Sequence, residues 1–396
     1  MVTLFIKTLK TFIAFYLQIL FLPFLILLSL ISRSIKKTVD IGLGPHPLIN
    51  NIYHKRALLA YGYKAETFVQ EVYFITEDFD IRGDKWLNGK LRFFLSYALF
   101  IWSIFRYKCL YLYFNGGSLG GTPLAEFEPY LYKLAGIKVV VMPYGADVQD
   151  LTRTPNLFFR HTMSIDYPNY RLMQVQIANQ VSRWTKNADY VISGCDWVDY
   201  MYHWNRLMLG HFSIDTSYWS PSCSDQENQH KDVNKLKILH APNHRNVKGT
   251  QFFIDAINSL KEDGYNIELV ILERVPNYQV KEVIASVDIV ADQLVVGWYA
   301  MFALEAMSMG KPVICYLRDD LESLYTQAGL ITENEVPIIN SNPLKIKSTI
   351  EQVYKERHLL VDIGQKSREF VIKHHSIDSI GRILSEINQT IGLNHI

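Results

Sequence analysis

The sequence predicts an α/β protein with two doubly wound parallel sheets, preceded by an N-terminal membrane-anchor helix. Three observations predict this. Apolar strands alternate with helical segments after residue 236, continuous apolar runs bounded by glycine occur earlier, and residues 11–32 carry no charge. Alternating strands and helices indicate parallel strands joined by right-handed crossovers. Two such sheets would face each other across a cleft, where ligands bind at the carboxyl ends of the strands.

The composition is that of a folded, two-domain chain. Its 396 residues are 49% apolar and 20% charged, and 40 basic against 39 acidic residues leave a net charge of +1. This balance provides no overall field to attract nucleic acid, so we expect no nucleic-acid partner. The four cysteines form no C-x-x-C pair, which fits a reducing compartment and indicates no zinc site.

Residues 1–37 are interpreted as a membrane anchor. The uncharged run at 11–32 is long enough to cross a bilayer at about 1.5 Å per residue. No small-residue cleavage site stands out, so the segment is expected to stay on the mature chain. Because Pro23 would kink a spanning helix, a helix lying in the membrane interface is the alternative. Basic residues flank the run on both sides and leave its orientation open: Lys7, Lys10, Arg33, Lys36 and Lys37.

The segment at 38–219 is predicted to form the first sheet domain. It opens with a short strand, a loop holding Gly42 and Gly44, a helix at 51–60 and a second strand at 65–69. Glycines in such a loop let the backbone turn tightly and approach a ligand at the helix start. We therefore assign both glycines to substrate binding, although the G-x-G pattern lacks the third glycine of a dinucleotide fingerprint.

Buried strands continue this first domain at 108–114 and 137–145, and a last strand ends near Ser193. Asp147 lies just after the second of these apolar runs. Its carboxylate could orient an acceptor hydroxyl or act as a catalytic base, and capping a turn is an equal alternative.

A polar stretch at 220–235 is interpreted as the linker to a second sheet domain at 236–375. The segment at 376–396 is predicted to be a C-terminal helix that could pack back on the first domain. The elements expected in the second domain are strands at 236–241, 267–272, 288–292 and 312–316 and helices at 250–263, 278–286 and 301–309.

A pair of cations stands between the first strand and the first helix of this second domain. The run LKILHAPNHRNVKGT places Arg245 and Lys248 just before a helix opened by Gly249 and Thr250. Cations beside the positive end of a helix favour a diphosphate. Two solvated surface charges are the alternative, but the position at a strand end favours a site.

A single carboxylate lies on an otherwise apolar helix further along. Glu305 sits in FALEAM, within a segment that should be largely buried, so it needs hydrogen-bonding partners. Ribose hydroxyls would provide them, and a buried ion pair is the alternative. Asp292 and Gln293 end the preceding strand and could contact the sugar, although a strand-end aspartate is often only a cap.

The span 236–317 resembles the donor-binding domain of GT-B-fold glycosyltransferases of the GT4 type, which contain two Rossmann-like domains. The resemblance rests on HAPNHRNVKGT, ELVILERV, VDIVADQ and GWYAMFALEAMSMGKPVI, and more loosely on FNGGSLGG, PYGADV and IDTSYW. It implies transfer of a sugar from a nucleotide diphosphate sugar with retention of configuration, usually without a metal or another cofactor. It implies that Arg245 and Lys248 bind the diphosphate and that Glu305 binds the ribose. Backbone amides near Ala300 and Met301 would approach a phosphate.

Two positions depart from the pattern of the family. The acidic pair of the family spans eight positions, which from Glu305 leads back to Gly297, so the first carboxylate is missing from the substrate-binding loop. The strand that often supplies a histidine near the reacting centre reads YLYFNGG and offers Tyr113 and Asn115 instead. These departures weaken the assignment of donor-sugar contacts and of the residues in the first domain.

The sequence thus predicts a membrane-anchored glycosyltransferase with a cytoplasmic catalytic body. Its partners would be a nucleotide diphosphate sugar, the membrane and an acceptor that is lipid-linked or belongs to a surface polysaccharide. The alternatives are a catalytically degenerate partner subunit of the same fold and a tethered two-domain sugar-binding protein. The basic loop and Glu305 argue against the last, because free sugars need neither.

Overall fold

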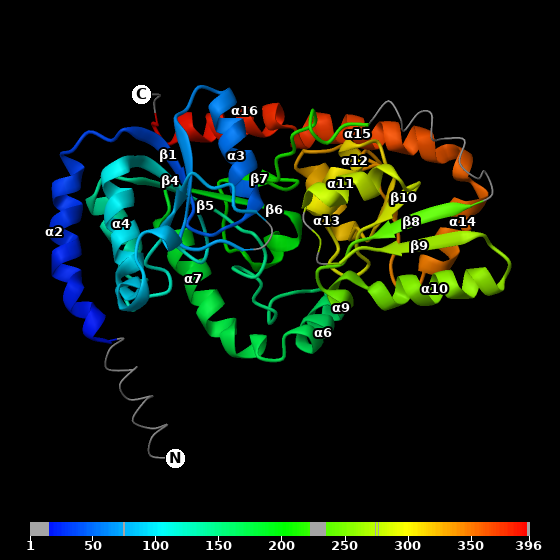
Figure 1. Ribbon diagram of the computed structural model, residues 1–396, viewed down its shortest axis with the longest axis horizontal. Helices are drawn as coiled ribbons and strands as arrows, with labels where there is room; N and C mark the ends of the chain where they lie inside the picture. Colours follow the sequence, from blue (N-terminus) through cyan, green and yellow to red (C-terminus); the bar gives the residue numbers. More distant parts are fainter. Residues whose placement is uncertain (1–15, 74–75, 222–234, 274, 276, 394–396) are drawn as a thin grey trace, which may run out of the picture.

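The computed structural model contains two parallel sheets, each covered by helices, that lie side by side along the long axis of the molecule (Figure 1). It describes residues 16–73, 76–221, 235–273, 275 and 277–393. The prediction of an α/β protein with two doubly wound parallel sheets is confirmed. The predicted linker lies mostly outside the described residues.

Within the described residues, seven strands form the first sheet in the order β3-β2-β1-β4-β5-β6-β7. Every neighbouring pair is parallel. The central strand β4 has all but one of its side chains buried, as the continuous apolar run predicts. The strands are β1 (Val39–Leu43), β2 (Ala65–Val69), β3 (Ile81–Arg82), β4 (Tyr107–Tyr113), β5 (Lys138–Met142), β6 (Tyr190–Gly194) and β7 (Arg206–Met208).

Helices cover both faces of this sheet. Alternate residues of β4 point to opposite faces, so Tyr111 packs with α3 and α16, whereas Leu110 packs with α4, α5 and α7. The α-helices of this part of the chain are α2 (Leu22–Arg33), α3 (Ile49–Ala60), α4 (Leu95–Arg106), α5 (Glu128–Leu134), α6 (Leu157–Asp166) and α7 (Gln174–Asn187). Short 3-10 helices are η1 (Gln18–Phe21), η2 (Gly83–Lys85), η3 (Gly89–Phe94), η4 (Tyr170–Met173) and η5 (Cys195–Tyr200).

The second sheet has five strands within the described residues, in the order β12-β11-β10-β8-β9, again all parallel. The order reverses between β8 and β10, which is where ligands bind in folds of this kind. The strands are β8 (Leu236–His240), β9 (Ile267–Ile271), β10 (Ile289–Ala291), β11 (Val313–Cys315) and β12 (Ile339–Asn340). The helices are α9 (Arg245–Lys248), α10 (Thr250–Glu262), α11 (Asn277–Ala285), α12 (Met301–Ser308), α13 (Asp319–Gln327), α14 (Ile346–Lys355), η7 (Arg357–Leu359), α15 (Leu360–His375) and α16 (Ile377–Thr390).

The last helix, α16, returns to the first domain, where it lies beside α3 (Figure 1). Tyr111 donates a hydrogen bond of 2.8 Å from its hydroxyl to Asn388, and Tyr61 donates one of 3.0 Å to Asp378. The chain therefore crosses between the domains twice, once after β7 and once between α15 and α16.

The N-terminal segment differs from the predicted anchor helix. Residues 1–15 lie outside the described part of the chain. From Gln18 the chain forms η1 and then α2, which packs against α4 and α5. Among the described helices, none combines the length and the apolar character needed to cross a membrane.

Candidate functional site

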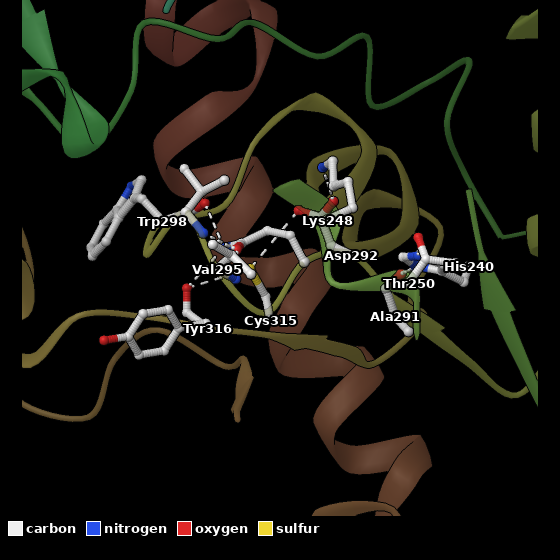
Figure 2. Close-up of polar contacts among 11 residues, drawn as sticks. His240, Lys248, Thr250, Ala291, Asp292, Val295, Trp298, Cys315 and Tyr316 are labelled. Atoms are coloured by element: carbon white, nitrogen blue, oxygen red, sulfur yellow. Dashed lines mark hydrogen bonds and ion pairs between the residues drawn. The ribbon is translucent and has the colours of Figure 1, made fainter. Parts of the chain in front are cut away.

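The cation loop begins at the carboxyl end of β8, where one buried histidine ties three elements together. His240 Nδ1 donates to the carbonyl of Ala291 at 2.8 Å, and its Nε2 accepts from the hydroxyl of Thr250 at 2.9 Å (Figure 2). Burial lowers the pKa of His240 to about 4, so the ring is neutral at pH 7. Gly249 then turns the chain from α9 into α10 with a φ of 75°. The loop is thus fixed to the ends of β8 and β10.

Lys248 is held in place by Asp292. Its Nζ lies 2.6 Å from Asp292 Oδ1, and the two side chains are 14% and 0% exposed (Figure 2). The structure brings together two residues that the sequence singled out separately, one from α9 and one from the end of β10. Asp292 orients the lysine, which is a different task from the sugar contact expected of it.

Arg245 lies on the exposed side of the same loop. Its guanidinium makes two hydrogen bonds of 2.9 Å to the carboxylate of Glu273, and both side chains are largely in water. The loop therefore presents one cation with a fixed position and one that can move, since an exposed ion pair of this kind is weak.

Gln293 shapes the loop that follows β10. Its side-chain oxygen accepts from the amides of Val295 and Val296 at 2.8 and 2.6 Å, and its nitrogen donates to the carbonyls of Trp298 and Tyr316. Every polar atom of this buried side chain is engaged by the protein. Gln293 thus supports the loop, and we assign it no direct contact with a sugar.

The loop leads into the first turn of α12, where Ala300 is the cap residue and Met301 the first helical residue. The first amides of a helix have no partner within it and suit an anion. Glu305 lies one turn further and is 4% exposed. Burial and, to a lesser degree, the charge of Glu305 raise the pKa of Tyr53 to about 12, so Glu305 lies near α3 of the first domain.

Gly297 occupies the position where the resembled family has a carboxylate. Its φ is 100°, a conformation that favours glycine, and a Cβ there would lie 2.6 Å from Cδ of Arg318. The space beside Gly297 is therefore filled by an arginine side chain, and no carboxylate could replace the glycine without a shift of Arg318.

Arg318 joins the two domains. Its guanidinium binds Asp199 of η5 at 2.5 Å and Asp320 at 2.5 Å, and its side chain is 7% exposed. Burial works against the charge, but the hydrogen bonds to Asp320 and Asp199 raise the pKa of Arg318. Asp196 lies next to this pair, and its Oδ2 has no hydrogen-bond partner within the described part of the chain. Burial, followed by the charge of Asp199, raises the pKa of Asp196 to about 7.

The substitution Asp196→Asn is expected to stabilise the protein more at pH 8 than at pH 5. An aspartate with a folded pKa near 7 and an unfolded pKa near 4 stabilises the fold while protonated, and that contribution is lost as the pH rises through 7. Asparagine does not ionise and carries no such penalty. The free energy of unfolding of the variant minus that of the unchanged protein should therefore rise by up to about 3 kcal/mol between pH 5 and pH 8. Urea unfolding of both proteins at the two pH values measures this stability difference. The same difference at pH 5 and pH 8 would contradict the raised pKa of Asp196.

The first domain also covers the cation loop directly. Asp166 at the end of α6 accepts from the side chain of Asn246 at 2.6 Å and from the amide of Val247 at 3.3 Å. Next to it, the hydroxyl of Tyr167 lies 2.5 Å from Nδ1 of His244. Sequence reasoning missed these contacts, because the D-Y pair that ends α6 gives no signal of a distant partner.

A second contact from α6 holds the loop after β10. Asn156 Nδ2 donates to the carbonyl of Val295 at 2.7 Å, while its Oδ1 caps α6 by accepting from the amide of Phe159. The carboxyl ends of β8, β10 and β11 thus all lead to loops that contact the first domain. A pocket of about 540 Å³ between residues 332–339 and α15 contains none of the predicted site residues.

In the first domain, Gly42 and Gly44 have packing roles. Gly42 lies within β1, and a Cβ there would be 2.6 Å from the ring of Tyr107. Gly44 lies at the end of the strand, where a Cβ would collide with the carbonyl oxygen of Phe68. Close packing against a side-chain ring explains Gly42 and close contact with a neighbouring backbone explains Gly44, so their assignment to substrate binding has no support from this geometry.

We expect Gly44→Ala to lower the free energy of unfolding by about 3 kcal/mol, because the backbone of β2 cannot yield as a side chain would. Gly121→Ala is the matched control, since a Cβ at Gly121 meets nothing within 4 Å. Denaturant unfolding compares the two. If both variants are equally stable, packing does not explain the glycine at position 44, and contact with a ligand would be the remaining explanation.

Asp147 is fully buried, and its carboxylate accepts hydrogen bonds from three backbone amides. Phe114, Tyr144 and Gly145 donate at 3.0, 2.9 and 2.9 Å. Burial raises the pKa of Asp147 to about 7 against the effect of these donors. The side chain ties the ends of β4 and β5 together, which is the capping role that the sequence left open. Its assignment as a catalytic base would require it to leave these amides.

A polar cluster reaches the surface at the carboxyl ends of β1, β4 and β5. Asn115 Nδ2 donates to the hydroxyl of Tyr144 at 2.8 Å and lies 3.2 Å from His46 Nε2. Gln180 fixes the orientation of this amide by donating to Asn115 Oδ1 at 3.3 Å. Burial lowers the pKa of His46, so its ring is neutral at pH 7. His46, Asn115 and Tyr144 are partly exposed, whereas Asp147 is fully buried.

Comparison with solved structures identifies the fold. No family model and no curated protein gives a significant match to the sequence. HepE from Anabaena, solved in complex with UDP, superposes with a TM-score of 0.55 at 13% identity, covering 90% of this chain and 100% of that one. Sucrose-phosphate synthase from Thermosynechococcus elongatus gives 0.57 at 12% identity, with coverage of 90% and 99%. WaaG, a glycosyltransferase involved in lipopolysaccharide biosynthesis, gives 0.50 at 12% identity, with coverage of 88% and 99%.

These neighbours are GT-B glycosyltransferases, and the chain has their fold over nearly its whole length. The resemblance to the GT-B fold seen in the sequence is confirmed. At 12–13% identity the similarity establishes the architecture, and the activity must be argued from the residues.

Proposed function

We propose that the protein is a glycosyltransferase that takes a sugar from a nucleotide diphosphate sugar. The observation that carries this proposal is the position of Lys248. Its ammonium group is anchored on the buried carboxylate of Asp292 at the point where the strand order of the second sheet reverses. A fixed cation at this place, with the first turn of α12 following the same strand, suits a diphosphate.

The proposed reaction breaks the bond between the anomeric carbon and the diphosphate oxygen. Negative charge builds on the departing diphosphate, and Lys248, Arg245 and the amides at Ala300 and Met301 would stabilise it. Glu305 would hold the ribose hydroxyls. As the oxygen of the acceptor hydroxyl bonds to the anomeric carbon, its proton passes to the departing diphosphate oxygen. We assign the positioning of the acceptor hydroxyl to the cluster of His46, Asn115 and Tyr144.

Retention of configuration and independence from metals are part of the proposal, by the resemblance to the GT4 type. The described residues contain no group of three or more His, Cys, Asp or Glu side chains arranged to hold a metal. A lipid-linked or surface-polysaccharide acceptor is proposed from the apolar N-terminal segment.

Binding and turnover with UDP-, GDP- and dTDP-sugars test the proposal. We expect one of these nucleotide sugars to bind and to be hydrolysed slowly. Transfer of its sugar should be faster when an extract that contains acceptor is added. The variant Arg245→Gln should weaken nucleotide binding without changing the unfolding midpoint, because its partner Glu273 is exposed. Failure of all three nucleotides to bind would overturn the proposal.

A second candidate is a degenerate subunit that keeps the fold without the reaction. The observation that favours it is the contact between Gly297 and Arg318, which replaces the missing carboxylate with an ion pair between the domains. Nucleotide binding without turnover, with or without acceptor, would select this alternative.

A further inference from the structure

The outer side of the first domain carries an exposed apolar face. It is formed by η1 and α2 together with η3, and α2 lies at the end of the molecule away from the second domain (Figure 1). The residues that define this apolar face are Leu20, Phe24, Leu27, Leu30, Leu91 and Phe93, all of them exposed. Contiguous exposed apolar surface on a folded domain marks a contact with another apolar phase.

The helix α2 is apolar on both of its sides. It buries Leu25 together with Ser29 and Ser32, and Phe24, Leu27 and Leu30 are exposed on its outer side. Ser32 donates from its hydroxyl to the carbonyl of Ile104 at 3.1 Å, and Lys37 donates to the carbonyl of Ser32 at 2.6 Å. A surface helix in water carries charged and polar residues on its outer side. The outward side of α2 therefore fits an apolar environment.

The two parts of the apolar face are continuous and fixed. The rings of Phe21 and Phe94 lie 5.9 Å apart, and the hydroxyl of Tyr97 donates to Gln18 Oε1 at 2.7 Å. At 12 residues, α2 is about 18 Å long and shorter than a bilayer core. Because it packs on α4 and α5, it lies along the surface of the first domain.

Basic residues outnumber acidic residues around the apolar face, and one of the basic residues, Arg92 of η3, pairs with Glu71. Residues 1–39 hold five basic residues and no acidic one, and residues 85–125 again hold five basic residues and no acidic one. All 39 acidic residues lie in the rest of the chain, where they outnumber the basic residues. Arg33, Lys36, Lys85 and Lys90 form no ion pair with any described residue. Cations beside exposed apolar side chains match a bilayer that contains anionic lipid.

We propose that the apolar face docks the first domain on an anionic lipid bilayer, with α2 lying in the interface parallel to the membrane plane. The leucine and phenylalanine side chains enter the headgroup region, and the basic side chains contact lipid phosphates. This placement goes beyond the proposed transfer reaction and does not depend on it, since docking requires only the surface of the first domain.

Sedimentation of the full-length protein with vesicles tests the proposal. Phosphatidylcholine vesicles with and without phosphatidylglycerol would be compared for the unchanged protein and two double variants. Leu20→Ser with Leu27→Ser alters the face at positions 75% and 55% exposed, and Leu344→Ser with Val361→Ser is the matched control at 95% and 61%. All four positions are exposed, so thermal unfolding should be unchanged.

We expect the unchanged protein and the control to bind the anionic vesicles, and the face variant to bind at least about tenfold more weakly. Lys36→Gln with Lys90→Gln should weaken binding to the anionic vesicles by about fivefold for each charge removed.

Equal binding by the face variant and the control would overturn the proposal and assign any attachment to residues 1–15. Failure of the unchanged protein to bind anionic vesicles would also overturn it. A dimer that the face variant converts to a monomer, with vesicle binding unaltered, would show that a second copy of the chain covers the face. Nucleotide binding is measured separately, so failure of docking leaves the proposed reaction standing.

Discussion

Replacing Lys248 with alanine is expected to lower turnover by at least about a hundredfold, because the variant loses a fixed cation at the place where charge develops on the diphosphate. The structure adds a second expected effect. Asp292 is fully buried and would keep its carboxylate without the partner now 2.6 Å away. Leaving one member of a buried ion pair costs about 3 kcal/mol of stability. Turnover and urea unfolding of the same preparation measure the two effects.

The double variant Lys248→Gln with Asp292→Asn separates catalysis from folding. It removes both charges and preserves the approximate shape of the pair, so most of the stability should return. Turnover should remain low, since no cation faces the diphosphate. Normal turnover of the double variant would remove Lys248 from the site, whereas low turnover in a stable protein would establish its role.

The fold could be predicted because it depends on patterns that are local in the sequence. The apolar runs at 108–114 and 137–145 became β4 and β5, and the strand and helix alternation after residue 236 became β8 to β11 with their helices. The predicted anchor shows what such patterns leave open. An uncharged run at 11–32 does not reveal which of its residues pack on a domain. The structure adds that Ser29 and Ser32 are fully buried and that α2 packs on α4 and α5, whereas residues 11–15 lie outside its described part.

The candidate residues that the sequence proposes in the second domain belong to one motif. Arg245, Lys248, Ala300 and Glu305 follow each other in a fixed order along the second domain. Contacts between the domains join residues that are far apart in sequence, such as Asp166 with Val247 and Asn156 with Val295. Neither member of such a pair has a local pattern that names its partner. The sequence could not distinguish the two possible roles of Gln293, because supporting a loop and contacting a sugar require the same side-chain amide.

Replacing Arg318 with methionine is the change for which we expect the largest loss of stability. Arg318 and Asp199 are 7% and 9% exposed, so the variant would bury the aspartate without its cation. That situation costs about 3–5 kcal/mol. Arg82→Met is the control, because Arg82 binds Glu77 and Asp84 in a similar fork but near water, and its loss should leave the unfolding midpoint unchanged.

The companion variant Arg318→Met with Asp199→Leu decides what the ion pair does. Replacing both members of a buried pair with apolar side chains is often neutral, so stability should return if the pair serves only to fill the interface. Methionine would also leave the space beside Gly297 without a charge. If the double variant is stable and its donor turnover is unaltered, the pair is a structural contact between the domains. If the double variant is stable but loses turnover, Arg318 orients the loop from Gly297 to Ala300 for the donor. The absence of a carboxylate at Gly297 would then change how the donor is contacted, and the reaction would be retained.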